Sequence, residues 1–368
     1  MRKPIRQSGT STAVSTIDGG RRKVIRQCIA AVGSIALSGR GTAAEPPLPA
    51  RPPAPIPSLA RLPTLGGTQF WSDTLIRPPW RIQRHVLTDV CRLLDGDDRA
   101  VSWGSYKKCL QQFAELERQR QVPPLKPRVV IVLHGAIRTR RSMARLCRFL
   151  ESRAGYTAIN VSYASTRAEI SRHARTLAQI IGHLGPQVKE INFVAHSMGN
   201  LIIRHFLQDQ KRLSRPPAGY PKIRRIVMLA PPNQGTQLAQ RVQDNLVFRA
   251  LWGVSGGEMA TWNALAPRLA IPACEFGIIA GDFLAPQEGN PLIEGPDDLV
   301  LAVSETRLPG AHDFLELPVS HSTIMHDERV QTATLRFLTR GHFRDSRARK
   351  PIPSTPPPSK NLTPKAGS

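Results

Sequence analysis

The chain has 368 residues, 40% of them hydrophobic and 21% charged, and its formal net charge is +24. This balance excludes a fibrous or wholly disordered protein, and the length allows one sizeable hydrophobic core or two small ones. So strong a positive charge can serve nucleic acid or an anionic surface. The basic residues are spread along the chain, without zinc-ligand spacing or a basic motif interleaved with aromatic residues, so we expect no nucleic-acid partner.

Residues 1–44 have the order of an export signal. Arg21 and Arg22 precede a moderately apolar stretch, and small residues follow at 42–44. The apolar stretch is too short to span a membrane permanently. The paired arginines favour a twin-arginine signal, although Val24 stands where that motif usually has phenylalanine. We therefore expect export to the periplasm or the cell exterior; the alternative is a basic leader on a cytoplasmic protein.

Two segments are dense in proline. Residues 45–66 cannot form the interior of a helix or a central strand, so they predict a stiff extended linker. Residues 343–368 have the same character and few core-forming side chains, which predicts a disordered tail rich in Pro, Ser and Lys. The folded part of the chain is therefore expected between these two segments.

Residues 67–126 are predicted to be an N-terminal helical segment. Apolar positions recur at spacings of three and four over 81–95 and over 106–120, which predicts two amphipathic helices. Of the five cysteines, one lies in the signal and four remain, an even number that permits disulfides in an exported protein. The pair that we expect is Cys91 with Cys109. No function follows from the residues of this segment.

Residues 127–342 carry the pattern of an α/β catalytic domain, in which short apolar runs rich in β-branched residues alternate with helical stretches. The expected strands are 129–135, 157–163, 191–197, 223–232, 275–282 and 312–319. Continuous apolar strands that alternate with helices indicate a mostly parallel central sheet with helices on both faces. In such sheets the reactive groups gather at the carboxyl ends of the strands.

Ser197 lies at the junction between the strand INFVA and the helix NLIIRHF. A tight strand-to-helix turn lifts the serine hydroxyl above the sheet and needs small flanking residues, which Ala195 and Gly199 provide. This pattern predicts a nucleophilic serine. The alternative is a serine that caps a helix by chance.

A serine is a poor nucleophile unless a histidine takes its proton and an acid orients that histidine. His321 follows the last expected strand and is the candidate base. The acid should lie between the serine and the histidine in the chain. Asp298, in an acidic loop, and Asp282, directly after the preceding strand, are both candidates.

The chemistry also needs two backbone N–H groups that bind the developing oxyanion. Met198, the residue after the serine, should supply one of them. The other should come from Ala136, in the loop after the first strand of the sheet, where Gly135 lets the backbone turn tightly.

These residues resemble the α/β-hydrolase lipases and esterases, particularly small bacterial lipases with an AHSMG turn. The resemblance covers residues 128–340, with VAHSMG as the nucleophile turn and LHGA as the oxyanion loop. It implies an α/β-hydrolase fold in which Ser197 attacks a carboxyl ester, His321 moves the proton and Asp298 orients His321. The similarity of DLVLAVSETRLPGA to the acid segment of that family favours Asp298 over Asp282. No metal or organic cofactor is implied.

Two stretches depart from that pattern. Residues 233–270 are longer than the family needs and carry an apolar patch, so they predict either a helical lid over an acyl pocket or an ordinary helix on the core. The insertion at 283–295 lengthens the acid loop, which keeps Asp282 open as an alternative acid.

The expected function is that of a serine hydrolase, a lipase or esterase, whose acyl-ester substrate can be a lipid. One alternative is the same serine chemistry on a polyester, an amide or an acyl-transfer acceptor. Another is a non-catalytic α/β-hydrolase scaffold that binds an anionic surface, but this would predict a damaged turn or a missing histidine, and neither is seen. The basic surface also suggests peripheral contact with an anionic membrane or wall polymer. The oligomeric state does not follow from the sequence.

Overall fold

The computed structural model describes residues 67–213, 219–242, 244–283 and 289–354. The predicted export signal, the proline-rich linker and residues 355–368 of the predicted tail lie outside the described residues. Of the helices in the described ranges, none is long and apolar enough to cross a membrane.

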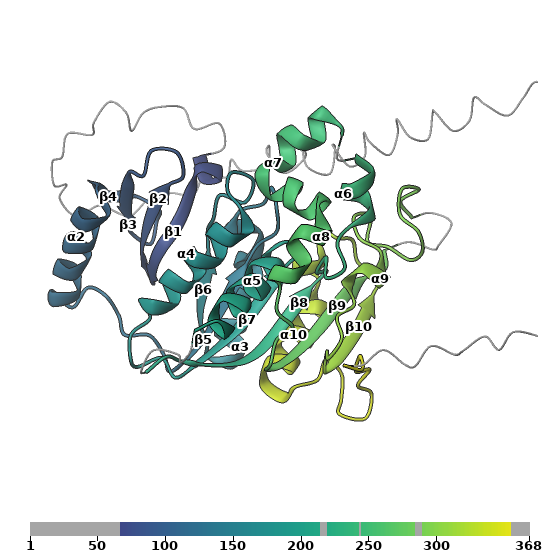
Figure 1. The fold of residues 1–368 in the computed structure, drawn as a ribbon. Coiled ribbons are helices and arrows are strands. Elements are labelled where there is room, and N and C mark those ends of the chain that lie inside the picture. Colours follow the sequence, from purple (N-terminus) through teal and green to yellow (C-terminus); the bar gives the residue numbers. More distant parts are fainter. Residues whose placement is uncertain (1–66, 214–218, 243, 284–288, 355–368) are drawn as a thin grey trace, which may run out of the picture. The chain divides into compact units, whose positions relative to one another are not determined.

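The centre of the fold is a sheet of six parallel strands in the order β10-β9-β8-β7-β5-β6 (Figure 1). The strands are β5 (Arg128–Leu133), β6 (Thr157–Val161), β7 (Glu190–His196), β8 (Lys222–Leu229), β9 (Glu275–Gly281) and β10 (Asp313–Leu317). Each lies within or beside one of the six predicted ranges, so the prediction of six strands is confirmed. They are apolar along nearly their whole length because both faces of the sheet are buried.

Helices cover both faces of this sheet. The side chains of Val129 and Ile131 pack into one core with α4 (Ile170–Gly182) and α5 (Gly199–Lys211). The side chain of Val130, which points the opposite way, packs into a second core with two further helices. These helices are α3 (Ala144–Ala154) and α10 (Glu328–Arg340). The expected α/β-hydrolase fold, with a parallel sheet between two helical layers, is confirmed.

The remaining helical elements of this domain lie in the chain segments that follow the strands. They are η3 (Arg140–Met143), α6 (Gln237–Val242), α7 (Leu246–Ala260), α8 (Trp262–Leu265), η4 (Ala266–Arg268), α9 (Val303–Thr306) and η5 (Ile324–His326). Three of these, α6, α7 and α8, lie in the predicted lid region, and α6 and α7 are at the top of the view in Figure 1.

A second sheet precedes the domain of the six-stranded sheet, and the prediction of two helices there is wrong in part. This small sheet has four antiparallel strands, preceded by η2 (Gly67–Phe70) and followed by α2 (Tyr106–Arg118). The strands are β1 (Trp71–Arg77), β2 (Trp80–His85), β3 (Cys91–Leu94) and β4 (Ala100–Gly104). Helix α2 confirms the second predicted helix, whereas residues 81–95 form β2 and β3.

The strands of 81–95 form because cross-strand pairing buries the same apolar residues that a helix would have placed on one face. Ile82 and Leu93 are opposite each other in the β2–β3 pair, and both are fully buried beneath α2. Within so short a run, an apolar spacing of three or four fits a hairpin as well as a helix.

The predicted disulfide is also wrong for this structure. Cys91 and Cys109 are free, buried thiols in the apolar core between the small sheet and α2. Burial raises the pKa of the Cys109 thiol to about 11, so this group is neutral near pH 7. Both cysteines act as small hydrophobic side chains.

The predicted disorder of the tail is wrong for its first part. Phe343 is buried in the second core, and its N–H donates to the Asp313 carboxylate at 2.7 Å. Farther along, Ile352 exchanges backbone hydrogen bonds with Gly310 and Ala311, both at 2.9 Å. The ordered fold therefore extends about ten residues into the predicted tail, because Asp313 and the chain beside it bind the backbone there.

Candidate active site

Ser197 occupies a strained turn at the carboxyl end of β7, two residues before α5 begins. Its φ of 51° is in the left-handed region, which residues with a side chain rarely adopt. The turn is held by hydrogen bonds: the Ser197 N–H donates to the Leu229 carbonyl at 2.9 Å, and the Asn200 amide donates to the Ala195 and Ser197 carbonyls. Such strain persists where the surroundings over-determine the backbone, as these bonds do.

Gly199 explains why the turn needs a small residue on its far side. A Cβ at this position would lie 2.7 Å from the His134 carbonyl oxygen and 3.0 Å from the Leu133 Cβ. The start of α5 therefore packs directly on the end of β5, and a larger residue would push the two elements apart.

His321 and Asp298 form a buried pair on the same edge of the sheet. The Nδ1 of His321 is 2.7 Å from the Oδ2 of Asp298, and the His321 N–H donates to the Asp298 carbonyl at 2.8 Å. Asp298 is fully buried, and its Oδ1 accepts the N–H groups of Val300 and Leu301. One carboxylate oxygen is therefore fixed by its own loop, and the other faces the imidazole.

Asp282, the alternative acid, is placed differently. Its N–H donates to the Leu317 carbonyl, and its Oδ1 is buried without a hydrogen-bond partner in the described ranges. The hydrogen bonds of the described residues bring Asp298, and not Asp282, to His321. Gly281 shows how close the elements are, since a Cβ there would lie 2.8 Å from the Asp298 Cβ.

His196 supports His321 from the strand side, a role that the sequence did not suggest. Its Nε2–H donates to the His321 carbonyl at 3.0 Å, and the two ring centroids are 4.7 Å apart. Burial, and secondarily the charge of nearby His321, holds the His196 pKa well below its usual value. The ring is therefore neutral near pH 7 and keeps one N–H for the His321 backbone.

The loop after β5 lies against Ser197. A Cβ on Gly135 would lie 2.7 Å from the His196 Nδ1 and 3.1 Å from the Ser197 Cβ, so a larger residue would force a neighbouring side chain to shift. The Nδ1–H of His134 donates to the Gly135 carbonyl at 2.8 Å. Because C=O and N–H point in opposite directions across a trans peptide, this bond also sets the direction of the Ala136 N–H.

His134 is neutral, and Tyr163 holds it in place. Burial lowers its pKa to about 4, so the ring is neutral near pH 7. The ring of Tyr163 stacks on it with centroids 4.0 Å apart, and the Tyr163 hydroxyl donates to the His134 carbonyl.

The residue directly after Ser197, Met198, is buried at the start of α5. The two predicted oxyanion amides thus belong to the two turns that meet at Ser197.

The sequence did not point to His196, Tyr163 or Asn200, although all three lie within two or three residues of an expected strand end. Their position beside the expected strand ends is the feature of the sequence that could have pointed to them. Among the described residues, no group of three or more His, Cys, Asp or Glu side chains could hold a metal ion.

Helix α7, part of the predicted lid region, is docked on the loop between β6 and α4. The Val254 N–H donates to the Thr166 carbonyl at 3.1 Å, and the Ser255 hydroxyl donates to the Ala168 carbonyl at 2.7 Å. The helix kinks at Gly253, whose φ is 56° and where a Cβ would clash with the Thr166 carbonyl at 2.0 Å. The kink therefore permits this close docking.

Comparison with known proteins gives one family model and several solved structures. A model described as "Domain of unknown function (DUF7379)" matches residues 98–269. No curated protein matches the chain. The mature lipase BlEst2 of Bacillus licheniformis is 17% identical, with 59% of this chain and 92% of that chain covered, at a TM-score of 0.40.

Two other solved structures have comparable values. The metagenomic carboxyl esterase MGS0156 is 18% identical over 55% of this chain and 68% of its own, at a TM-score of 0.40. The phospholipase PlaB of Legionella pneumophila is 20% identical over 49% of this chain and 45% of its own, at a TM-score of 0.39. At such values the fold assignment rests on the sheet order and the turn geometry of the chain itself.

Proposed function

We propose that the chain is a serine hydrolase that cleaves carboxyl esters, of the lipase or esterase class. The observation that carries the proposal is the buried Asp298–His321 pair at 2.7 Å, on the sheet edge where Ser197 is held in a strained turn. A serine hydroxyl alone would not require a paired histidine, and a helix cap would not require the left-handed φ. An activated nucleophile accounts for both.

In the proposed reaction, the Oγ of Ser197 attacks the ester carbonyl carbon while the Nε2 of His321 takes the hydroxyl proton. Asp298 keeps the proton on Nδ1 and stabilises the imidazolium that forms. The tetrahedral oxyanion accepts hydrogen bonds from the N–H groups of Ala136 and Met198. When the C–O bond breaks, the alcohol leaves with the proton from Nε2, and the acyl group stays on Ser197.

Water then completes the cycle by the same steps in reverse roles. His321 takes a proton from the water, the hydroxide attacks the acyl carbon, and the carboxylic acid leaves as Ser197 regains its proton. The site is well suited to this chemistry because Ser197 and His321 are each only 7% exposed. Low exposure strengthens every hydrogen bond to the developing charge.

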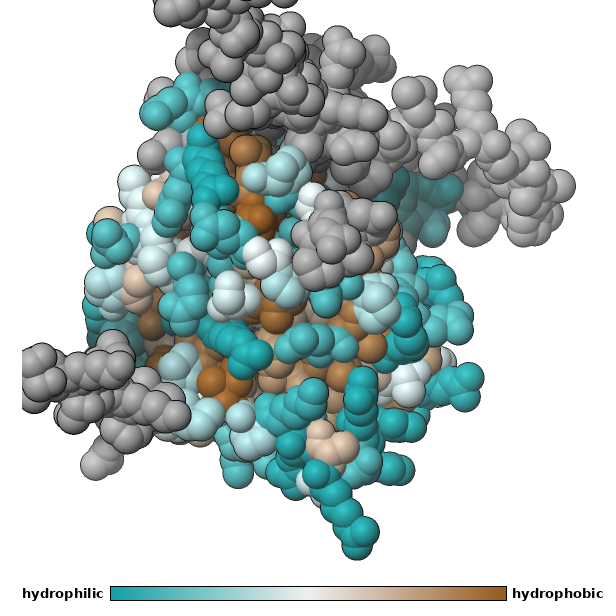
Figure 2. Space-filling model, turned by 90° about the vertical axis from the view of Figure 1, so that its right-hand side faces the viewer, coloured by the Kyte–Doolittle hydropathy of each residue, from teal (hydrophilic) through white to brown (hydrophobic). Residues whose placement is uncertain are grey.

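A lipid ester is the substrate class that we favour, with α7 as the candidate lid. The support is that α7 follows β8 in the chain and is docked on the loop that follows the carboxyl end of β6. On the face seen in Figure 2, hydrophobic residues form separate patches between hydrophilic ones. Because these patches are separate, this face offers no continuous apolar surface for a long acyl chain. Such a chain would need a covered pocket, and a lid would provide one.

The experiment is turnover of chromogenic acyl esters, from short to long chains, by the purified full chain and by its Ser197→Ala variant. The parent should cleave at least one member, and the variant should lose at least about 10⁴-fold in rate. The chain-length optimum separates an esterase from a lipase. If the parent cleaves no ester but does cleave amides or transfers acyl groups, the serine chemistry stands and the ester assignment fails.

We also propose export of the protein and contact of its basic surface with anionic lipid or wall polymer. The support is the arginine pair and small residues in 1–44, together with the net charge of +24. N-terminal sequencing of the protein from cell fractions tests export, since an exported form should begin near residue 45. Sedimentation with phosphatidylglycerol vesicles tests the contact, which should be lost as salt rises.

A further inference from the structure

We infer that η2, together with the small sheet that follows it, completes the oxyanion hole of the catalytic domain, with Gln69 of η2 as a positioning residue for the loop that carries the Ala136 amide. This inference rests on the proposed function, and it assigns a role to residues 67–104, for which neither the sequence nor the family model suggests one. The small sheet meets the catalytic domain at the two loops that follow β5 and β6.

Gln69 directly contacts the loop after β5. The Nε2 of Gln69 donates to the carbonyls of Ile137 (3.1 Å) and Arg138 (3.3 Å). The Oε1 of the same amide accepts from the Ser165 hydroxyl at 3.4 Å, in the loop after β6. The Gln69 side chain, in η2 directly before β1, therefore binds both loops, and its contact with the loop after β5 begins one residue after Ala136.

The loop after β5 contains a strained residue, so its conformation must be stabilised by contacts from outside the loop. Ile137 has a φ of 62°, a left-handed conformation that is strongly disfavoured for a β-branched residue. Backbone in such a conformation stays ordered only when its surroundings fix it. Gln69 binds the carbonyl of this very residue, while His134 binds the carbonyl of Gly135 on the other side of Ala136. The carbonyls of both residues flanking Ala136 are thus fixed by side chains.

The small sheet, which follows η2 directly, anchors Gln69 to the catalytic domain. Asp73 in β1 is fully buried and forms two hydrogen bonds with Ser162, directly after β6. Its N–H donates to the Ser162 carbonyl at 2.8 Å, and its carboxylate accepts the Ser162 N–H at 2.6 Å. Arg81 and Gln83 of β2 also donate to this carboxylate, each at 2.8 Å. At the opposite end of the sheet, Asp98 forms an ion pair with Arg140.

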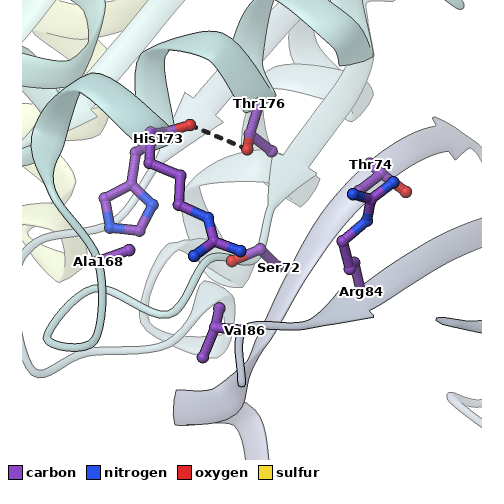
Figure 3. A pocket seen from close by; sticks show the side chains of 8 residues that line it. Ser72, Thr74, Arg84, Val86, Ala168, His173 and Thr176 are labelled. Atoms are coloured by element: carbon purple, nitrogen blue, oxygen red, sulfur yellow. Dashed lines mark hydrogen bonds between the residues drawn. The ribbon is translucent and has the colours of Figure 1, made fainter. Parts of the chain in front are cut away.

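The contact continues along α4, as Figure 3 shows. Ser72 and Thr74 of β1 line one side of a cavity of about 30 Å³, and His173 and Thr176 of α4 line the other. A cavity of this size has room for one water molecule. Only a small cavity therefore separates β1 from α4, which leaves the small sheet little room to move when Gln69 is changed.

Loss of the Gln69 contact should weaken stabilisation of the transition state and leave substrate binding nearly unchanged. An oxyanion donor acts fully only when it is already directed at the position of the oxyanion, and removal of one such donor costs about 10²- to 10³-fold in rate. Gln69 acts on this donor through the loop, so loss of its N–H groups should cost less than loss of the donor, on the order of tenfold or more in kcat. Substrate binding should change little, since Gln69 does not contact the acyl group in this account.

The test compares Gln69→Glu with Gln179→Glu in the full chain. Gln69→Glu keeps the shape and the contact with Ser165 but cannot donate to the carbonyls of Ile137 and Arg138. Gln179 is a matched control, because it is also half-buried and its amide donates at 3.0 Å to a side chain of α2, the Tyr106 hydroxyl, away from the loop. Gln69→Met, which is neutral and of similar shape, serves if the charged variant does not fold.

We expect both Gln69 variants to lower kcat about tenfold or more, with KM within about twofold of the parent. The affinity for an alkylboronic acid inhibitor should fall by the same factor as kcat, because its tetrahedral adduct needs the oxyanion hole. Gln179→Glu should change neither. A merely structural role would lower the melting temperature and leave kcat of the folded enzyme and boronate affinity intact, which would overturn the inference. Equal losses in Gln69→Glu and Gln179→Glu would also overturn it. If the parent cleaves no ester, the proposed function fails instead, which separates the two outcomes.

Discussion

Asp298→Asn is the sharpest test of the proposed triad, because the structure shows what the asparagine would do. The Oδ1 of Asp298 accepts the N–H groups of Val300 and Leu301 at 3.0 and 2.7 Å, so the asparagine would keep its carbonyl oxygen there. Its NH₂ group would then face the Nδ1 of His321, 2.7 Å from the present Oδ2. Since NH₂ only donates, Nδ1 would have to be the acceptor and Nε2 would carry the proton.

A histidine protonated on Nε2 cannot take the proton of Ser197. We therefore expect kcat to fall about 10⁴-fold, equivalent to roughly 5 kcal/mol of transition-state stabilisation, with a nearly unchanged fold. The matched variant is Asp282→Asn, which should stay within a few-fold of the parent. The assay is the initial rate on the best chromogenic ester, with circular dichroism as a check of folding. A folded Asp298→Asn enzyme within tenfold of the parent, or a larger loss in Asp282→Asn, would refute the assignment of the acid.

Three further predictions concern the framework around the site. Asp73→Ala would leave Arg81 and its other donors without their buried acceptor, so urea unfolding should show a loss of about 3–5 kcal/mol. Gly135→Ala would place a Cβ 2.7 Å from the His196 Nδ1, so ester turnover should fall at least about tenfold and stability by about 1–3 kcal/mol. Burial lowers the pKa values of His134 and His173 to about 4 and about 3. Below pH 6.5 the unfolded state therefore binds more protons than the folded state, and the free energy of unfolding should fall by about 2 kcal/mol per histidine between pH 7 and pH 5.

Each of these predictions has a control. Asp97→Ala, at an exposed turn of the small sheet, should leave stability unchanged, and a similar loss there would count against the role of Asp73. Gly182→Ala meets no atom within 4 Å, so activity should be retained; an active Gly135→Ala enzyme would mean that the loop can move away. His173→Gln should remove one histidine's share of the pH dependence, and an unaltered slope would contradict the account of burial.

Much of the catalytic domain could be predicted from the sequence because its signals are local. A strand buried on both faces must be apolar along its length, so the runs that became β5 to β10 were visible as such. The turn at Ser197 needs small neighbours, and Gly199 is one of them because a Cβ there would lie 2.7 Å from the His134 carbonyl oxygen. These features are determined by residues adjacent in the chain, and they hold in any fold with a covered parallel sheet.

Contacts between distant parts of the chain decided the rest. The sequence favoured Asp298 over Asp282 but left both open, and the hydrogen bond between Asp298 and His321 joins residues that only the folded chain brings together. The small sheet was missed because short apolar spacings suit a hairpin or a helix, and burial against α2 selected the hairpin. The contact of Gln69 with Ile137 joins residues 68 positions apart, and a single sequence contains no local pattern for such a pair. Local sequence thus determined the elements and the nucleophile turn, while tertiary packing decided which side chains surround that turn.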